Sequence, residues 1–349
     1  MRLPSDLYRV NQNGSITCLL CPKTCTLQPE KAGDCGNRKA VINDQGELVP
    51  IFRQVDRIEA VNLDPIEKKP LYHFQPGGNV LSLGLSGCNM TCYYCQNHAL
   101  SQDLKPKTFI SPEVTESLEQ EVTANVITQL ERAEQRTSSE NIIGVSFTYS
   151  EPITWFEFIY PIADQVKNKG YYNTIVSNGM MTSTTADKLI PLVDGVNFDV
   201  KAYDSLTYEK LGGNLNTVKQ IVEKFVSAGV HTEITYLVVP DFNDNNQIKD
   251  FLEWVADMSN DIPIHFSRYF PSYRAQSSPT PVATLLDCYD QATDYINHVY
   301  LGNLGREKYQ TTYCWNCSEE VIKRSMFAID VRLKNGKCPV CDSKIAGVF

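Results

Sequence analysis

The stretch from about residue 80 to residue 303 alternates short β-rich runs with longer segments of helical period. Repeated βα units of this kind build a parallel sheet covered by helices. The predicted strands are Val80–Ser86, Ile142–Tyr149, Tyr172–Ser177, Val196–Ala202, Thr232–Val239 and Ile264–Phe270. The predicted helices are 112–136, 154–169, 182–192, 214–228, 245–259 and 281–297. The pattern therefore predicts an α/β protein whose centre is a partial (β/α)6 barrel of the TIM type.

The segments on either side of this barrel have a different character. Residues 1–79 include a Cys-, Gly- and Pro-rich stretch, and residues 304–349 form a short tail with four cysteines. Segments this short rarely build a sufficient hydrophobic core, and a bound metal can replace the missing stabilisation. We therefore expect three regions: an amino-terminal metal module with a wrapping segment (1–79), the barrel (80–303) and a carboxyl-terminal ribbon (304–349).

The twelve cysteines fall into three groups, with Cys288 standing alone. The amino terminus lacks the basic start and apolar run of a secretory signal, so we expect a cytoplasmic protein. Thiols there are kept reduced, and closely spaced cysteines are usually metal ligands or catalytic groups. The groups are Cys18, Cys21, Cys25 and Cys35; Cys88, Cys92 and Cys95; and Cys314, Cys317, Cys338 and Cys341.

The central group is one ligand short of a complete metal site. Cys88, Cys92 and Cys95 form a C-x3-C-x2-C loop directly after the first predicted strand. A 4Fe-4S cluster held by three cysteines keeps one iron open, and at the carboxyl end of a barrel strand that iron would face the active-site side. The alternative is a zinc site, or a cluster completed by a distant residue. The three cysteines are the candidate catalytic and metal-binding residues.

The other two groups have four thiols each. The tail has C-x2-C-x20-C-x2-C spacing, which is typical of a closed structural zinc site in a zinc ribbon, with a rubredoxin-like iron as the alternative. The amino-terminal group has C-x2-C-x3-C-x9-C spacing. That spacing suits zinc, which its Cys-Pro and Cys-Gly turns slightly favour, or a second iron-sulfur cluster for electron entry.

The triad also carries a resemblance to a known family. The segment LSLGLSGCNMTCYYCQN, with Tyr94 before the last cysteine, resembles the signature of the radical SAM superfamily. The resemblance implies a 4Fe-4S cluster that passes one electron to S-adenosylmethionine and releases a 5′-deoxyadenosyl radical, which abstracts hydrogen. It also implies an electron donor such as flavodoxin or ferredoxin.

Polar residues end the second, third and fourth predicted strands, where this family binds S-adenosylmethionine. Glu151 resembles the acidic residue of the family's turn, although the usual Gly-Gly is absent. Ser177 and Asn178 can present hydroxyl and amide groups, and an Asn-Gly pair is also an ordinary turn. Asp199 and Lys201 resemble the Asp-x-Lys of activase-type members. The lysine ammonium can pair with the methionine carboxylate.

Two further residues on later strands are candidates for the same cofactor. Val238 lies in an apolar segment that resembles the one packing on adenine, and such β-branched runs are also common in cores. His265, on the sixth predicted strand, would line the opposite wall. A lone histidine on a buried strand can equally be a hydrogen-bonded core residue.

Segments outside the triad narrow the resemblance. LDPIEKKPLYHFQPGG at 63–78, CQNHALSQD at 95–103, HFSRYFP at 265–271 and both flanking cysteine groups resemble the radical SAM component of the AmmeMemoRadiSam system, which is related to pyruvate formate-lyase activating enzymes. That family name implies Memo-like and AMMECR-type protein partners. Residues 63–78 would either wrap the bottom of the barrel or bring Lys68, Lys69, Tyr72 and His73 to its mouth.

Three functions compete at this point. The first is a radical SAM enzyme that modifies a small molecule or a protein residue, and the second is an activase that installs a glycyl radical in a protein partner. The third is a non-catalytic iron-sulfur or zinc-ribbon protein, which would need four ligands at every cluster. A net charge of −9 makes nucleic acid an unexpected partner, and no run of 18 apolar residues suggests a membrane span.

Overall fold

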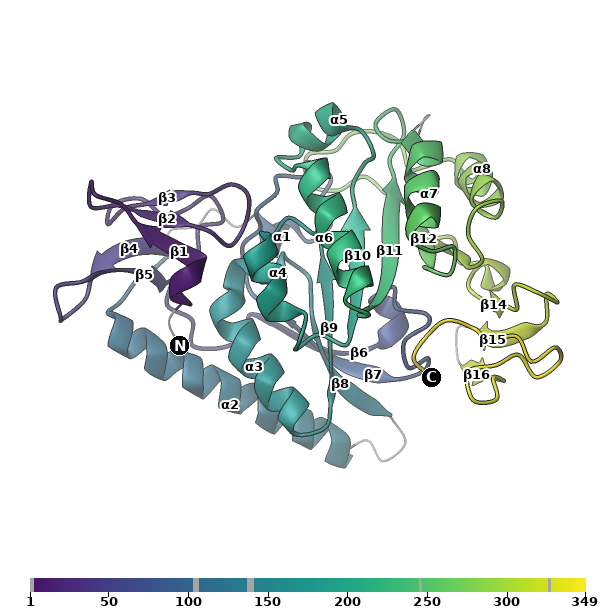
Figure 1. The fold of residues 1–349 in the computed structure, drawn as a ribbon, viewed down its shortest axis with the longest axis horizontal. Helices are drawn as coiled ribbons and strands as arrows, with labels where there is room; N and C mark the ends of the chain where they lie inside the picture. The colour runs from purple at the N-terminus through teal and green to yellow at the C-terminus, as the bar shows by residue number, and fades with distance from the viewer. Residues whose placement is uncertain (1–2, 103–106, 137–140, 245–246, 326–327) are drawn as a thin grey trace.

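One curved sheet forms the centre of the molecule (Figure 1). The computed structural model describes residues 3–102, 107–136, 141–244, 247–325 and 328–349. The order of the strands in the sheet is β13-β12-β11-β10-β9-β8-β7-β6. They are β6 (Ala60–Pro65), β7 (Asn79–Gly84), β8 (Ile142–Phe147), β9 (Tyr172–Ser177), β10 (Gly195–Val200), β11 (His231–Val238), β12 (Ile264–Arg268) and β13 (Val299–Gly302). From β7 to β13 every neighbouring pair is parallel.

The α/β class and the parallel sheet predicted from the sequence are confirmed, but the expected number of strands was too low. The described sheet has a seventh parallel strand, β13, and an antiparallel edge strand, β6. β13 has only four residues and directly follows a segment that was assigned to a helix. β6 contains Asn62, Asp64 and Pro65, which weaken any strand signal and are tolerated at a sheet edge.

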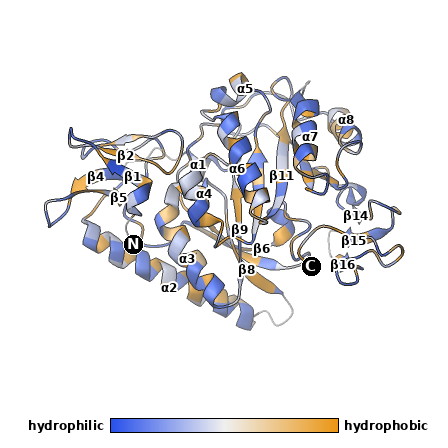
Figure 2. Ribbon diagram, in the orientation of Figure 1, coloured by the Kyte–Doolittle hydropathy of each residue, from blue (hydrophilic) through white to orange (hydrophobic). Residues whose placement is uncertain are grey.

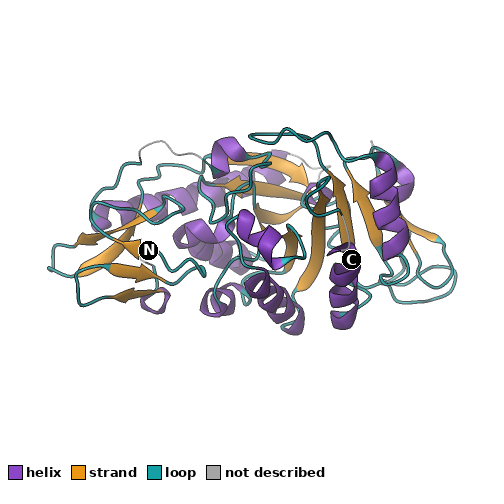
Figure 3. Ribbon diagram, turned by 90° about the horizontal axis from the view of Figure 1, so that it is seen from above, coloured by secondary structure: helices purple, strands orange, loops and turns teal. Residues whose placement is uncertain are grey.

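The larger helices cover the outer face of the sheet, so that the strands form an inner wall (Figure 3). Helices α2, α3, α4, α6, α7 and α8 match the predicted segments, except that residues 245–246 lie outside the described part. Their apolar positions face the sheet and their polar ones face solvent (Figure 2). Among the described helices, none is both long enough and apolar enough to cross a bilayer. The bounds are α1 (His98–Ser101), α2 (Pro112–Arg136), α3 (Phe156–Asn168), α4 (Ser183–Leu189), α5 (Ser205–Lys210), α6 (Leu215–Ser227), α7 (Gln247–Met258) and α8 (Val282–Ala292).

A buried carboxylate closes the amino-terminal end of the barrel. Glu233, near the start of β11, accepts hydrogen bonds from the backbone N–H groups of Tyr72 (2.9 Å) and His73 (2.7 Å). Its two oxygens also lie 2.9 Å from Nε2 of His231 and 2.6 Å from Nε2 of His265. Burial would raise the pKa of Glu233, but the hydrogen bonds and charges of His231 and His265 hold it well below its usual range. Residues 63–78, called the wrapping segment below, are thus held across the bottom of the barrel.

This arrangement decides where residues 63–78 lie. Tyr72 and His73 sit at the bottom of the barrel, not at its mouth, and the side-chain amide of Asn197 donates to the carbonyl of Pro70 there. Lys68 and Lys69 both pair with Asp64 of β6, at 2.7 and 2.8 Å.

The amino-terminal module contains two small antiparallel sheets and lies at one end of the barrel (Figure 1). A buried ion pair joins it to the barrel: Arg38 of β4 binds both carboxylate oxygens of Glu157 in α3. Thr182, which caps α4, also hydrogen-bonds the carbonyls of Leu19 and Leu20. Its strands are β1 (Tyr8–Val10), β2 (Ile16–Cys18), β3 (Thr26–Leu27), β4 (Arg38–Ile42) and β5 (Leu48–Phe52), with 3-10 turns η1 (Ser5–Leu7) before them and η2 (Ile66–Lys68) after β6.

The carboxyl-terminal ribbon lies at the opposite end (Figure 1). His73 connects the barrel bottom to it, because its ring nitrogens lie 2.6 Å from the carbonyl oxygen of Ala346 and from the hydroxyl of Tyr300. Arg324 donates to Thr312 (2.9 Å) and to the carbonyl of Tyr72. The ribbon strands are β14 (Thr312–Tyr313), β15 (Glu320–Arg324) and β16 (Ile329–Val331), and the remaining 3-10 turns are η3 (Pro152–Trp155) and η4 (Glu307–Tyr309).

Stability should fall in mild acid because of His298, which packs against His73 at a ring distance of 4.5 Å. Burial lowers the pKa of His298 to about 4, so the unfolded chain binds this proton more readily. Stability present above the unfolded pKa is therefore lost as the pH falls, by about 2 kcal/mol between about pH 7 and about pH 5. Urea unfolding at both pH values should show a smaller loss for His298→Phe than for the wild type. Equal losses would contradict this assignment.

Candidate active site

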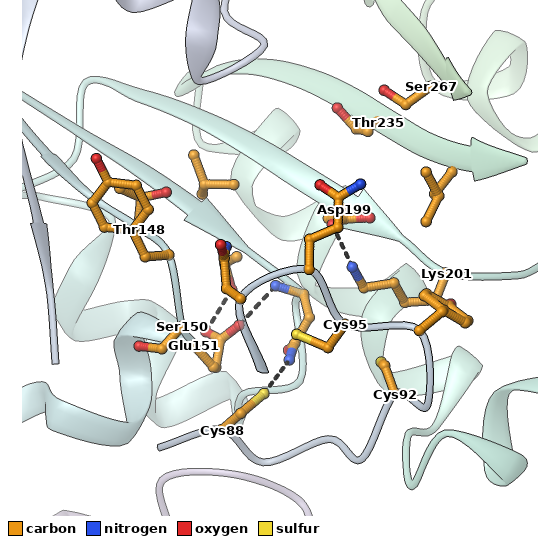
Figure 4. Close-up of a pocket in the computed structure, with 18 of the residues that line it drawn as sticks. Cys88, Cys92, Cys95, Thr148, Ser150, Glu151, Asp199, Lys201, Thr235 and Ser267 are labelled. Atoms are coloured by element: carbon orange, nitrogen blue, oxygen red, sulfur yellow. Dashed lines mark hydrogen bonds and ion pairs between the residues drawn. The ribbon is translucent and has the colours of Figure 1, made fainter. Parts of the chain in front are cut away.

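Three cysteines from the loop after β7 line a cavity of about 250 Å³ at the carboxyl ends of the strands. Cys92 is buried, and Cys88 and Cys95 are half-buried. Figure 4 shows them on one side of the cavity, with Glu151 beside them and Asp199 and Lys201 beyond. Burial raises the pKa of the Cys92 thiol to about 11 and that of Cys88 well above its ordinary value. Thiols placed this way need a cationic partner to become thiolates.

The acidic turn that follows β8 supplies a buried carboxylate. Glu151 caps η3 and accepts hydrogen bonds from the Ser177 hydroxyl and the Asn178 backbone N–H, both at 2.8 Å. Burial raises its pKa to about 7, while these donors and the nearby Lys201 act in the opposite direction. Glu151 is thus fixed by residues that end the neighbouring strand, β9, and its charge responds to any cation that enters the cavity.

The fourth parallel strand, β10, ends in an ion pair. Asp199 and Lys201 lie on the same side of the chain and contact each other directly through Oδ2 and Nζ. Burial alone would lower the pKa of Lys201, but Asp199 and Cys92 raise it, so the side chain is an ammonium. The other carboxylate oxygen of Asp199 is buried and has no hydrogen-bond partner among the described residues. It is therefore available to a polar group in the cavity.

Two asparagines tie the triad loop to the end of β9. The side-chain amide of Asn178 donates to Oδ1 of Asn89 (2.9 Å) and lies 3.8 Å from the sulfur of Cys88. Asn89, which is buried, donates in turn to the carbonyl of Met180 (2.6 Å). This chain of hydrogen bonds fixes the triad loop relative to the strand ends.

Most of the residues chosen from the sequence meet in this cavity, but two do not. Cys88, Cys92, Tyr94, Cys95, Glu151, Ser177, Asn178, Asp199 and Lys201 line it. Val238 is buried on the other face of β11, while its neighbour Leu237 lines the cavity. His265 lies one layer deeper, bound to Glu233. Val238 and His265 therefore do not belong to the candidate site.

The cavity also contains polar residues that the sequence did not single out. Thr235 and Ser267 occupy inward positions two residues from Leu237 and His265. The Thr235 hydroxyl is buried without a partner among the described residues. Side chains alternate between the two faces of a strand, so counting two residues from a known inward position would have identified both. Gln96, Asn97, Gln102, Thr148 and Asn303 also line the cavity.

Comparison with known proteins identifies the family. An uncharacterized protein of Methanocaldococcus jannaschii is 30% identical over 348 residues, which is 97% of each chain. The sequence model of the radical SAM superfamily matches residues 84–255. The chain belongs to the radical SAM superfamily. A 7-carboxy-7-deazaguanine synthase of the same archaeon is 22% identical over 191 residues, covering 53% of this chain and 73% of that protein.

A solved structure shows the same fold. A radical SAM methyltransferase from Sphaerobacter thermophilus aligns with a TM-score of 0.50 and 15% identity over 75% of each chain. Together with the family match, this likeness confirms the expected partial barrel of the TIM type.

The residues present fit the cluster and S-adenosylmethionine that the superfamily implies. Three of the twelve described cysteines line the cavity, and the other nine lie outside its lining. A cluster bound there would keep one iron without a cysteine ligand. Beside the thiols stand a carboxylate, Glu151, and an ammonium, Lys201, which match the amino and carboxylate groups of an amino-acid ligand. The unpartnered oxygens of Asp199 and Thr235 are further sites for its polar groups.

The carboxyl-terminal cysteines form a compact metal-binding group. The sulfurs of Cys314 and Cys341 lie 3.5 Å apart and those of Cys317 and Cys338 3.6 Å apart, and all four lie within 4.8 Å of one another. Thiolates bound at about 2.3 Å in a tetrahedral site would be ~3.8 Å apart. The group can therefore hold one tetrahedral ion.

Loss of one ligand from the ribbon should remove one metal ion per chain. We expect Cys317→Ser to lower the metal content by about one equivalent and to destabilise the ribbon, because a structural metal contributes directly to folding. Elemental analysis of purified protein measures this, with the buried Cys288→Ala as the control. An unchanged metal content would contradict the assignment.

Proposed function

We propose that this protein is an enzyme whose cluster, bound by Cys88, Cys92 and Cys95, cleaves S-adenosylmethionine reductively. The observation that carries the proposal is the three-thiol set in a cavity that also holds a carboxylate and an ammonium. When bound, the cluster and S-adenosylmethionine supply one electron and a 5′-deoxyadenosyl radical that abstracts hydrogen. A non-catalytic carrier is disfavoured because the described cysteines provide no fourth thiol in this cavity.

The protein's own residues bind and orient the cofactor. Glu151 would accept hydrogen bonds from the methionine ammonium, and Lys201 would pair with its carboxylate. Ser177 and Asn178 keep the Glu151 carboxylate aimed at the cavity, and Asp199 keeps Lys201 beside Cys92. Leu237 offers an apolar surface on the wall formed by β11, where Val238 was expected to pack on adenine.

The substrate is a small molecule or a protein residue, and a glycyl-radical activase is the alternative within the same chemistry. The motif resemblance supports Memo-like and AMMECR-type partners and a flavodoxin or ferredoxin as reductant. From the sequence pattern we also propose cytoplasmic function and three regions: 1–79, 80–303 and 304–349. Zinc is the ion we propose for the ribbon.

The central test is cofactor cleavage. Anaerobically reconstituted protein with dithionite and S-adenosylmethionine should form 5′-deoxyadenosine and methionine, which chromatography detects. Cys92→Ala should abolish this, because removing a cluster thiolate removes the electron source. Lack of cleavage by the wild type, or cleavage that survives in Cys92→Ala, would refute the proposal. Deuterium transferred to 5′-deoxyadenosine from a deuterated candidate would then identify the substrate class.

Glu151→Gln should weaken S-adenosylmethionine binding by about tenfold to a hundredfold while leaving the iron content unchanged. The substitution removes a charge-assisted hydrogen bond to an ammonium but keeps the size of the side chain. Equilibrium binding to the reconstituted protein measures the effect, and the exposed Glu209→Gln is a matched control. Equal affinities for Glu151→Gln and the wild type would show that another residue receives the amino group.

A further inference from the structure

The four amino-terminal cysteines surround one cavity on the side of the module that faces the barrel. Cys18, Cys21, Cys25 and Cys35 all line it. The backbone N–H of Cys18 donates to the carbonyl of Cys25 (2.9 Å), which fixes two of the ligands across β2 and β3. A Cβ atom at Gly33 would lie 3.3 Å from Cβ of Cys25, so the last loop packs closely on the thiols. The four thiols therefore belong to one preformed site.

The spacing of these thiols differs from that of the ribbon. Among the described residues, only the ribbon brings three or more possible ligand atoms within 4.8 Å of one another. No three of the amino-terminal thiols lie within 4.8 Å of one another, and the same holds for the triad. One tetrahedral ion draws all four sulfurs close together, whereas in a cubane each thiolate binds a different iron and the sulfurs are spread around the cluster. The spacing therefore favours a cubane over zinc.

Two cationic side chains line the cavity, and each is paired with a carboxylate. The buried guanidinium of Arg38 and the ammonium of Lys23 both line it. Arg38 is fixed there by Glu157, and Lys23 lies 3.5 Å from a carboxylate oxygen of Asp34. Four thiolates around one Zn²⁺ ion or around an oxidised cubane would carry the same net charge of about −2. The charge of the lining therefore does not distinguish the two groups, and the choice between them rests on the spacing of the thiols.

This cavity and the triad share a wall only a few residues thick. Gly87, directly before Cys88, packs so closely on the module that a Cβ there would lie 2.9 Å from the carbonyl oxygen of Cys35. Asn89, directly after Cys88, lines the amino-terminal cavity and also accepts the hydrogen bond from Asn178 at the triad. Cys35 and Cys88 both line a third hollow between the two sites.

We propose that Cys18, Cys21, Cys25 and Cys35 bind a second 4Fe-4S cluster that passes single electrons to the triad across residues 87–89. In each transfer the amino-terminal cluster loses one electron and returns to its oxidised form, and the triad cluster is reduced by that electron. An external low-potential one-electron donor protein restores the first cluster. The transfer role rests on the proposed function, but the binding of the cluster does not.

Metal analysis of paired variants tests the site. Protein with Cys88→Ala, Cys92→Ala and Cys95→Ala, reconstituted with iron and sulfide, should keep about four irons and four sulfides per chain. Adding Cys21→Ser and Cys25→Ser should remove them, while the metal of the ribbon stays and reports a folded chain. A triad variant that holds no iron and an extra zinc would overturn the proposal. Because this readout needs no S-adenosylmethionine, it is independent of the cleavage assay.

Electron paramagnetic resonance tests contact between the two clusters. In dithionite-reduced wild type, two nearby paramagnetic clusters should broaden or split each other's signals. The triad variant and the Cys21→Ser, Cys25→Ser variant should each give a simple spectrum of one cluster. A wild-type spectrum equal to the sum of the two variant spectra would overturn the transfer role.

Discussion

The architecture depends on the hydrogen-bonded ladder of parallel strands from β7 to β13. Parallel pairing brings the carboxyl ends of successive strands to one edge of the sheet, so residues that follow each strand become neighbours. The triad loop after β7, Glu151 after β8, Ser177 at the end of β9 and the Asp199–Lys201 pair on β10 share one cavity for this reason. More than a hundred residues separate the first from the last in the chain, and the ladder alone brings them together.

The opposite ends of the same strands have a structural role. Inward positions there carry Asn197, Glu233 and His265. In the wrapping segment the carbonyl of Pro70 accepts from Asn197 and two backbone N–H groups donate to Glu233, which also binds His265. Without that segment Glu233 would be a buried carboxylate lacking two backbone donors, which is costly. The barrel therefore has an open polar layer at its mouth and a closed polar layer at its base. The same closure holds the carboxyl-terminal ribbon through His73.

The amino-terminal module is positioned by close backbone packing on the triad loop. Gly87 has φ +119°, and a side chain there would collide with Asn37 and with the carbonyl of Cys35. Asn37 in turn donates to the carbonyls of Ser86 and Thr154, at 3.0 and 3.1 Å. The module thus supports the loop that carries Cys88 while it presents its own four thiols to the adjacent cavity. One contact surface thus supports both groups of cysteines.

The sequence alone determined the chemistry-bearing groups and the class of fold. Cysteine spacing is a local property, and strongly periodic βα segments reveal their strands and helices without knowledge of the rest, so both could be predicted. The tertiary structure decided which way each side chain points and how far from the mouth of the barrel it lies. Leu237 replaced Val238 because a shift of one residue along a strand reverses the side-chain direction, and His265 proved to be a base-layer residue because its partner, Glu233, is 32 positions away. Edge strand β6 and the position of the amino-terminal thiols also depend on contacts distant in sequence, which local patterns do not encode.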